Sequence, residues 1–322
     1  ADLTDKKELP GASLKVTDED GNTVDEWVSK EEAHIIKGLI VGKKYKMTET
    51  KPADGYVTAE SIEFTVENTK EVQKHQMLDD VTKVEISKKD ITDSSEVPGA
   101  KLIILDKDGK KVESWTSTDK PHMVEKLPVG EYTLREEQAP DGYLIAEDVK
   151  FTVKDTGKVQ KVKMKDAHPY GKLVIKKTDS TSKAALSGAE FELREKESGK
   201  VVEKLVTDKT GTATSGKIPI ATYKNGKVEK TVEYILVETK APNGYELSNK
   251  KEEIRFEYKD GKTKVIEIVK EIKNTKSPSG STPTGNSPKT GDSTNIWLPI
   301  LLAVLSACGI GGVIWYKKKK GN

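Results

Sequence analysis

The stretch YTLREEQAPDGY at residues 132–143 lies near the middle of the chain and has close copies on either side. Successive side chains of a β-strand point to opposite faces, so Tyr132, Leu134 and Glu136 share one face. That face is apolar until it reaches Glu136, and the segment APDGY that follows is a typical turn sequence. The stretch therefore predicts a strand with one buried face that ends in a carboxylate.

Two further copies make this stretch the marker of an internal repeat. They read YKMTETKPADGY at residues 45–56 and YILVETKAPNGY at residues 234–245. Each copy has a glutamate at the same point, so Glu49 and Glu238 correspond to Glu136. Repetition of this kind indicates several units of one fold within the chain.

The segments around the three stretches predict an all-β fold. Short apolar runs alternate with turns that contain Gly, Asp and Pro, a pattern typical of a β-sandwich or a small barrel. No convincing helical period occurs before residue 296. We expect the last strand of the three units at residues 72–77, 159–164 and 265–272.

The repeats divide most of the chain into three domains, which we place at residues 1–80, 81–168 and 169–276. In the second and third domains a strand-like run precedes the first turn, whereas only Ala1 stands at this place in the first. We therefore expect the first domain to lack its opening strand. The third domain is longer, and its added residues around 212–231 predict a long loop or an added hairpin.

The C-terminal part has a different composition. Residues 277–286 are rich in Ser, Pro, Gly and Thr, which is typical of a flexible linker. Residues 296–316 contain no charged residue and are long enough to cross a bilayer as a helix. Residues 317–320 are four lysines, which stop such a segment and stay on the cytoplasmic side. We therefore predict one C-terminal transmembrane helix.

Charge and cysteine content exclude several classes of protein and site. The net charge is +2, and the C-terminal lysines alone supply more than this, so the domains have no basic surface for nucleic acid. The single cysteine, Cys308, lies in the apolar segment, so the domains contain no disulfide. The four histidines lack the spacing of metal ligands, and the Asp-Gly turns lack that of a calcium loop. We expect no metal and no cofactor.

Three strands of the second domain each have an apolar face that ends in one ionisable group. Counting alternate positions, these groups are Lys88, Glu136 and Asp166. Burial lowers the pKa of a lysine and raises that of a carboxyl, a neutral amine is a nucleophile, and fixed contact favours amide formation. The set predicts either a Lys88–Asp166 isopeptide bond assisted by Glu136 or a buried salt-bridge triad.

The combined pattern strongly resembles the B-type domains of Gram-positive collagen adhesins and pilins, known as CnaB or SpaA-like prealbumin-like domains. It consists of Lys-x-Asp, Pro-Gly-Ala, Asp-Gly and the glutamate stretch, which is similar to the pilin E box, and it covers residues 2–275. The resemblance implies tandem immunoglobulin-like sandwiches, each with an isopeptide bond between its first and last strands. In the second domain it implies Lys88 as donor, Glu136 as catalytic residue and Asp166 as acceptor.

In the third domain the resemblance implies Lys177 as donor, Glu238 as catalytic residue and Asn274 as acceptor. An asparagine acceptor would release ammonia in place of water. Lys270 interrupts the apolar face of the acceptor strand, and this departure from the pattern implies a bulge or a weaker match.

The first domain matches the family pattern only in part. Glu49 and Asp79 occupy the catalytic and acceptor positions, but no lysine in the sequence matches the donor. We therefore expect this chain not to close a bond there. Because each bond forms only once in each domain, we do not expect an enzyme in the usual sense.

Residues 287–322 resemble a sortase cell-wall sorting signal, in which a short motif precedes an apolar span and a basic tail. The common motif is Leu-Pro-x-Thr-Gly, and here the five residues are Ser287, Pro288, Lys289, Thr290 and Gly291. The resemblance implies cleavage between Thr290 and Gly291 by sortase and transfer of the Thr290 carboxyl to peptidoglycan. The membrane would then be a partner only before cleavage. The alternative is a plain single-pass membrane anchor.

Together these patterns predict a secreted surface protein anchored in the cell wall of a Gram-positive bacterium, whose stapled domains form a stalk that presents an adhesive region. One alternative is a pilus subunit polymerised by a pilin sortase. Another is direct binding of host extracellular matrix, such as collagen, by the repeats. A membrane-bound enzyme is a third alternative, and nothing in the sequence supports it.

Overall fold

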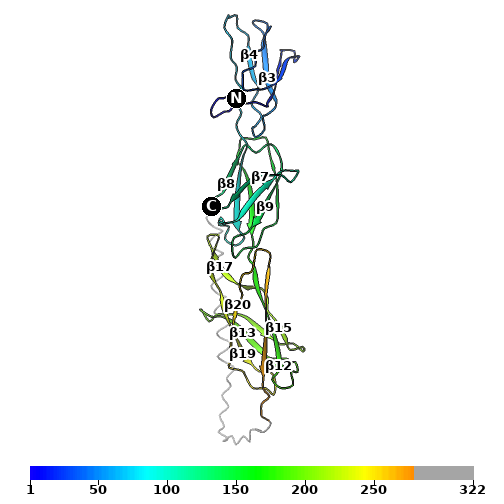
Figure 1. Ribbon diagram of the computed structural model, residues 1–322, viewed down its shortest axis with the longest axis vertical. Coiled ribbons are helices and arrows are strands. Elements are labelled where there is room, and N and C mark those ends of the chain that lie inside the picture. The colour runs from blue at the N-terminus through cyan, green and yellow to red at the C-terminus, as the bar shows by residue number, and fades with distance from the viewer. Residues whose placement is uncertain (279–322) are drawn as a thin grey trace, which may run out of the picture. The chain divides into compact units, whose positions relative to one another are not determined.

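The computed structural model describes residues 1–278, which consist of β-strands, turns and loops (Figure 1). The predicted all-β class is confirmed for this part of the chain. Among these residues no helix has the length and apolar character needed to cross a membrane. The predicted transmembrane helix, the sortase motif and most of the linker lie outside the described residues.

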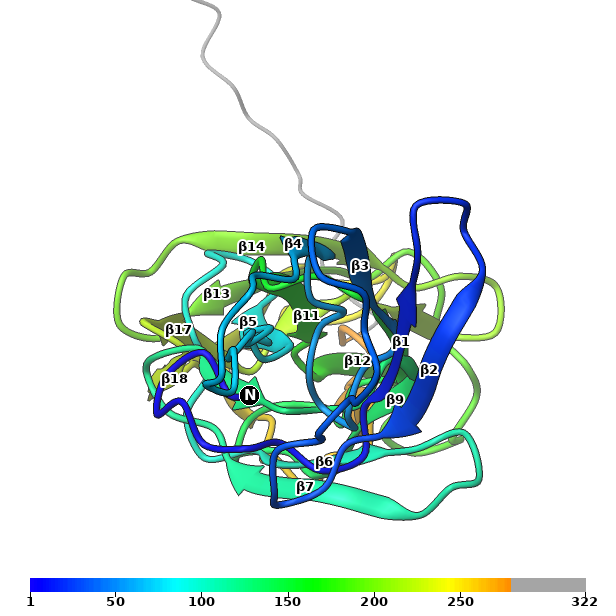
Figure 2. The ribbon, with the colours of Figure 1, turned by 90° about the horizontal axis from the view of Figure 1, so that it is seen from above.

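We refer to the domains at residues 1–80, 81–168 and 169–276 as repeats 1, 2 and 3. Repeat 1 contains one antiparallel sheet of four strands in the order β2-β1-β3-β4. Figure 2 shows β1 and β2 side by side. The core of this repeat is small and contains Val16, Tyr45, Met47 and Met77 as its buried members. The strands are β1 (Ser13–Thr17), β2 (Thr23–Val28), β3 (Lys44–Lys51) and β4 (Ile62–Thr65).

The strand predicted at residues 72–77 is wrong. Residues 72–78 form no strand, whereas the corresponding segments of the other repeats are β11 (Gln160–Asp166) and β21 (Val265–Asn274). These two strands pair in parallel with the first strand of their own repeat. The described residues of repeat 1 include no such first strand, so residues 72–78 have no neighbour with which to form a ladder.

Repeat 2 is a sandwich of two sheets. One sheet has the strand order β10-β9-β6-β7 and the other β11-β5-β8. Apolar side chains from both sheets meet in one core, which includes Ile86, Leu134 and Met164. The further strands are β5 (Lys83–Asp90), β6 (Lys101–Leu105), β7 (Lys111–Thr116), β8 (His122–Glu125), β9 (Gly130–Gln138) and β10 (Val149–Val153).

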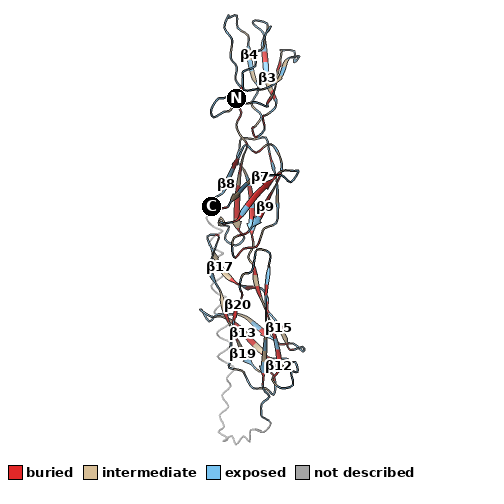
Figure 3. Cartoon of the chain, viewed as in Figure 1, coloured by how far each residue is buried: buried red, intermediate tan, exposed pale blue. Residues whose placement is uncertain are grey.

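Burial alternates along β9 as its sequence predicts. Tyr132, Leu134 and Glu136 are buried, whereas Arg135 and Glu137 between and after them are exposed (Figure 3). The apolar residues of the strand are buried because they face the opposite sheet. Glu136 is on the same face and is therefore carried into the core.

Repeat 3 is also built from two sheets. The first contains β15-β12-β16 with β21 beside β12, and the second has the order β14-β13-β19-β20. Its strands are β12 (Tyr170–Asp179), β13 (Glu190–Glu195), β14 (Val201–Val206), β15 (Thr212–Thr214), β16 (Ile218–Pro219), β17 (Ala221–Lys224), β18 (Lys227–Thr231), β19 (Glu233–Lys240), β20 (Lys251–Arg255) and β21.

The added residues of repeat 3 form an antiparallel hairpin of β17 and β18, one of the two predicted alternatives. The hairpin packs against repeat 2. The ring of Tyr223 stacks on His168 with 3.4 Å between centroids, and its hydroxyl donates a 2.8 Å hydrogen bond to the Gly142 carbonyl. At the tip, Gly226 has φ 69° and lies so close to the Glu96 carbonyl that no Cβ would fit.

Candidate functional site

The three residues selected in repeat 2 lie together in its core. Parallel pairing of β5 with β11 places Lys88 opposite Met164, so the Lys88 and Asp166 side chains emerge on the same face. The Lys88 Nζ contacts Asp166 Oδ1 and lies 3.0 Å from Glu136 Oε2. All three side chains are buried. The alternation of side chains along the three strands predicts that these three residues lie on the buried faces.

The two carboxyl groups of this site are short of hydrogen-bond partners. Glu136 Oε1 and Asp166 Oδ2 are buried and receive no hydrogen bond. Burial raises the pKa of Asp166 to about 7, with the Lys88 charge opposing the rise and Glu136 adding to it. One proton held between the two carboxyls would give both oxygens a partner. The site therefore favours a neutral carboxylic acid beside the lysine.

Repeat 3 has the same arrangement with an amide acceptor. Lys177 Nζ contacts Asn274 Oδ1 and lies 3.0 Å from Glu238 Oε1. The Asn274 amide donates to Glu238 Oε1 at 3.0 Å and to Oε2 at 3.1 Å. Burial lowers the pKa of Lys177, and Glu238 opposes this effect. Glu238 thus contacts both the amine and the nitrogen of the acceptor amide.

The acceptor strand of repeat 3 has no bulge at Lys270. Pairing of β12 with β21 is continuous from Tyr170 opposite Val265 to Asp179 opposite Asn274. Lys270 is only partly buried, and its amine lies 3.8 Å from Glu252. Of the two alternatives that the sequence left open, the bulge is therefore wrong, and the lysine is accommodated near the surface by an ion pair.

Repeat 1 contains the two carboxyls but not the amine. Glu49 and Asp79 are 4% and 3% exposed, and among residues 1–278 neither makes an ion pair with a lysine. Burial raises the pKa of Glu49 to about 7, with a hydrogen bond from the Ala59 amide opposing the rise and Asp79 adding to it. Burial also raises the pKa of Asp79. The terminal amine of Ala1 donates to the Met77 carbonyl at 2.8 Å.

A backbone amide ten residues further along holds each glutamate in place. The Ala146 amide donates to Glu136 Oε2 at 2.6 Å, and the Ala59 and Ser248 amides bond the equivalent oxygens of Glu49 and Glu238 at 2.7 and 2.9 Å. The turn after the glutamate stretch returns the chain to this point. The equal spacing in the three copies thus fixes one carboxyl oxygen of each glutamate. In repeat 3 the lysine contacts the other oxygen, whereas in repeat 2 it contacts the same one.

Sequence reasoning missed a second element of the site, an aspartate–tyrosine latch. The Tyr143 hydroxyl donates to Asp90 Oδ2 at 2.7 Å, which ties the turn after β9 to the end of β5, two residues beyond Lys88. The other repeats have the same bond at 2.8 and 2.9 Å, between Tyr56 and Asp2 and between Tyr245 and Asp179. The sequence contains a signal for this bond, because the aspartate and the tyrosine recur at equivalent positions in all three copies.

Burial opposes ionisation of Asp90, but hydrogen bonds from Thr92, Tyr143 and His168 outweigh it and hold its pKa at about 2. The carboxylate is therefore charged at neutral pH and accepts a strong hydrogen bond from the tyrosine.

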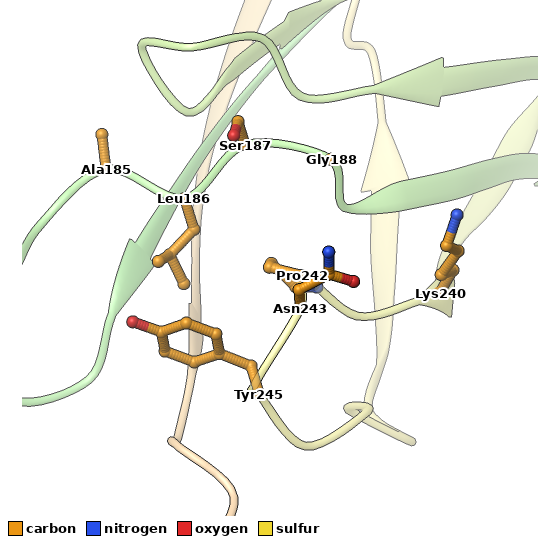
Figure 4. A pocket seen from close by; sticks show the side chains of 8 residues that line it. All are labelled: Ala185, Leu186, Ser187, Gly188, Lys240, Pro242, Asn243 and Tyr245. Atoms are coloured by element: carbon orange, nitrogen blue, oxygen red, sulfur yellow. The ribbon is translucent and has the colours of Figure 1, made fainter.

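A shallow pocket of about 420 Å³ lies next to the latch of repeat 3. Figure 4 shows the Tyr245 ring beside Leu186, with Lys240 on the far side of Pro242. The pocket is lined mainly by the loop at residues 185–188 and by residues 240–245, and it does not include the buried lysine, glutamate or asparagine. Within residues 1–278 no cluster of side chains suits a metal ion.

Comparison with solved structures gives several similar chains. The TIE protein of Bacillus anthracis has a TM-score of 0.52 and 28% identity, over 85% of this chain and 49% of that one. This chain therefore spans about half the length of that protein. BcpA, the major pilin subunit of Bacillus cereus, has a TM-score of 0.44 and 19% identity, over 85% and 97% of the two chains. A search among curated protein sequences gave no match.

A family model matches three consecutive segments, residues 1–80, 82–168 and 171–272, and it describes a SpaA domain with a prealbumin-like fold. The matched segments cover most of the chain and coincide with the three repeats of strands. The chain therefore belongs to the SpaA family of prealbumin-like fold domains.

Proposed function

We propose that the chain is the covalently stapled stalk of a Gram-positive cell-surface protein, in which repeats 2 and 3 close the isopeptide bonds Lys88–Asp166 and Lys177–Asn274. The observation that carries the proposal is the contact of each buried lysine amine with its acceptor, beside a glutamate held by a backbone amide. An unreacted triad in which the two carboxyls share no proton would leave two carboxyl oxygens of repeat 2 without partners.

In repeat 2 the reaction joins the Lys88 amine to the Asp166 side chain. The lone pair of the Lys88 Nζ attacks Cγ of the protonated Asp166, the new C–N bond replaces a C–O bond, and water leaves. Glu136, 3.0 Å from the amine, accepts a proton from it and returns one to the departing hydroxyl. The raised pKa of Asp166, about 7, keeps this carboxyl in the form that can lose water.

In repeat 3 the leaving group is ammonia. Glu238 accepts a proton from the attacking Lys177 amine and transfers a proton to the Asn274 nitrogen, which already donates to both of its oxygens. Burial favours the neutral amine of Lys177 because it lowers the pKa of this group. Fixed contact within a folded core supplies the effective concentration that amide formation requires.

These bonds would change how force passes through the stalk. Each bond joins the first strand of a repeat to the parallel last strand, close to the C-terminal ends of both. Tension that enters through β5 would pass from Lys88 to Asp166, the last residue of β11, and leave through the chain that follows it. The residues between the two linked positions would lie outside the path of the load and would stay folded.

Intact-mass spectrometry of the complete chain tests the bonds. We expect a deficit of about 18 Da for the loss of water and about 17 Da for the loss of ammonia, one for each condensation. Glu136→Gln should remove only the first deficit, and Glu238→Gln only the second. A wild-type mass equal to that of the unmodified linear chain would overturn the proposal.

We further propose that sortase joins Thr290 to peptidoglycan and that the stalk presents an adhesive region. This part rests on the SPKTG motif, which lies outside the described residues. Wall fragments released by a peptidoglycan hydrolase should end at Thr290 with a wall peptide attached, and Thr290→Ala should release the protein from the wall. A ladder of high-mass species in the same extract would instead indicate a polymerised pilus subunit.

A further inference from the structure

A second contact joins the two reacting strands of repeat 2, just beyond Lys88 and Asp166. Asp90 follows Lys88 by two residues, and His168 follows Asp166 by two residues. The His168 Nε2 lies 2.9 Å from Asp90 Oδ2, the oxygen that also accepts the hydrogen bond from Tyr143. The Asp90 side chain is fully buried, and that of His168 is only 15% exposed. This pair therefore holds together the ends of the strands whose side chains react.

The imidazole of His168 is fixed from its other side by repeat 3. The Tyr223 ring lies flat on it, with 3.4 Å between centroids and 3° between the planes. The Tyr143 ring meets both of these rings edge-on, at 5.1 and 5.2 Å. Stacking sets the plane of the imidazole, and this plane decides whether Nε2 points at Asp90. A residue of repeat 3 thus completes a contact within repeat 2.

The tip of the same hairpin lies over the backbone that holds the donor lysine. Glu96 Oε2 accepts a hydrogen bond from the Lys88 amide at 3.0 Å, and the Val97 amide donates to the Lys88 carbonyl at 2.7 Å. Gly226 at the tip lies directly against the Glu96 carbonyl and the Val97 Cα. Docking of the hairpin therefore limits movement of the segment that pairs with Lys88.

This arrangement belongs to repeat 2. The residue two positions after the acceptor is Val81 in repeat 1 and Lys276 in repeat 3. Neither side chain has a flat ring that can stack and form a hydrogen bond at the same time. The proposed bond of repeat 3 lacks this device, and it therefore serves as a reference within the same chain.

We propose that His168 and Tyr223 are positioning residues for the Lys88–Asp166 bond, so that repeat 2 closes its bond at full rate only when the hairpin of repeat 3 is docked on it. Neither residue contacts the reacting atoms. Each acts through the ends of β5 and β11, which the Asp90–His168 pair holds together. This inference rests on the isopeptide chemistry proposed above.

The physical reason is the dependence of amide formation on fixed contact. A displacement of reacting groups by about 1 Å can slow such a reaction by about 100-fold. The condensation itself is unchanged, and only the fraction of time in which the amine meets Cγ of Asp166 differs. Because repeat 2 is synthesised before repeat 3, its bond would close late, after both repeats have folded.

The test follows both bonds of the complete chain in time. A freshly translated chain is kept in denaturant and allowed to refold, and samples are quenched in acid at intervals. Digestion then gives the amounts of the branched peptides Lys88–Asp166 and Lys177–Asn274. Tyr223→Ala should slow formation of the first by roughly tenfold and leave the second at the wild-type rate.

Two matched variants separate positioning from a general loss of structure. Tyr223→Phe keeps the stacked ring and should recover most of the rate at which the Lys88–Asp166 bond forms. Lys224→Ala changes an exposed neighbour and should leave both bonds at the wild-type rate. Equal slowing of the two bonds in Tyr223→Ala would overturn the proposal, as would failure of Tyr223→Phe to recover the rate.

A double variant tests whether Tyr223 acts through His168. His168→Ala should slow the Lys88–Asp166 bond about as much as Tyr223→Ala does. Addition of Tyr223→Ala to His168→Ala should then have little further effect, because residues that act through one contact are not additive. Multiplication of the two effects would contradict the proposed route.

The same digests separate this inference from the proposed function. If the wild-type chain forms neither branched peptide, the isopeptide chemistry is wrong. If it forms both and Tyr223→Ala closes the first bond at the wild-type rate, only the positioning role is wrong.

Discussion

Glu136 and Glu238 each have one oxygen fixed by a backbone amide and lie 3.0 Å from a buried lysine amine. This arrangement separates two tasks that a single carboxyl must perform. The amide bond sets the position of the side chain, and its contact with the amine allows proton transfer at the reacting atoms. A buried glutamate without both contacts would only destabilise the fold.

At this scale the first prediction concerns the stability that the bond of repeat 2 provides. Glu136→Gln keeps the size of the side chain but cannot accept the proton of Lys88. A cross-link over a loop of this length is worth about 4–5 kcal/mol on the chain-entropy account of disulfides. We expect calorimetry to show a lower melting temperature for repeat 2 alone.

Glu238→Gln is the matched control, because it should lower only the transition of repeat 3. Equal melting of repeat 2 in the wild-type chain and in Glu136→Gln would count against a covalent link.

The second prediction at this scale concerns pH and repeat 1. The pKa of Glu49 rises from an ordinary 4.5 to about 7 in the folded chain, so folding retains a proton that the unfolded chain would release. Stability is therefore greatest below about pH 4.5 and falls as the pH rises to about 7, by an amount on the order of a few kcal/mol.

Calorimetry of the wild-type chain and of Glu49→Gln between pH 4 and 8 measures this effect. The variant should lose the part of the pH dependence of repeat 1 that Glu49 contributes, whereas the part from Asp79, whose pKa burial also raises, should remain. Identical profiles for the two proteins would contradict the assignment.

At the scale of single elements, the alternation of side chains along a strand can be read from the sequence, whereas the pairing of strands depends on distant segments. The buried faces of β5, β9 and β11 follow from alternate positions, and therefore Lys88, Glu136 and Asp166 could be selected from the sequence. A strand has one buried face whatever its neighbour, so this inference needs only local information.

Other features depend on partners that lie far along the chain. Residues 72–77 have the composition of a strand but no parallel neighbour among the described residues, so they do not form one. Lys270 has the position of a core residue, yet an ion pair with Glu252 holds it near the surface. The bond between Tyr143 and Asp90 joins segments 53 residues apart. Both residues recur in all three copies, but recurrence alone does not show that they are in contact.

The latch gives the third prediction. Tyr143→Phe removes the hydrogen bond to the Asp90 carboxylate, and hydrogen bonds to charged groups are worth about 1.5–3 kcal/mol. Repeat 2 should melt at a lower temperature, and its bond should form more slowly because the end of β5 is held less firmly. A freshly translated chain is kept in denaturant and then allowed to refold. The time course of the loss of about 18 Da, one water, gives the rate at which the bond of repeat 2 forms.

Tyr132→Phe is the control, since its hydroxyl bonds only the neutral Pro128 carbonyl. If both variants slowed the reaction equally, the latch would have no special part in positioning Lys88.

At the scale of the whole molecule, the hairpin of repeat 3 couples two repeats. Tyr223 contacts His168 and Gly142 of repeat 2, and nearby the Ile145 amide donates to the Gly261 carbonyl at 2.8 Å. Two repeats linked in this way would resist bending where they meet.

The fourth prediction tests this coupling. Tyr223→Ala should speed hydrogen–deuterium exchange at residues 141–145 several-fold, because it removes the stacked ring and the bond to Gly142. The exposed neighbour Lys224 provides the control, and Lys224→Ala should leave the exchange unchanged. Equal protection in the two variants would show that the hairpin does not hold the repeats together.

The central claim is that the buried lysines are covalently joined to their acceptors. Tandem mass spectrometry of a proteolytic digest of the denatured wild-type chain tests it most directly. The account predicts one branched peptide in which Lys88 is joined to Asp166 and another in which Lys177 is joined to Asn274, with the first absent from Glu136→Gln. Recovery of the four linear peptides from the wild-type chain, each at its unmodified mass, would contradict it.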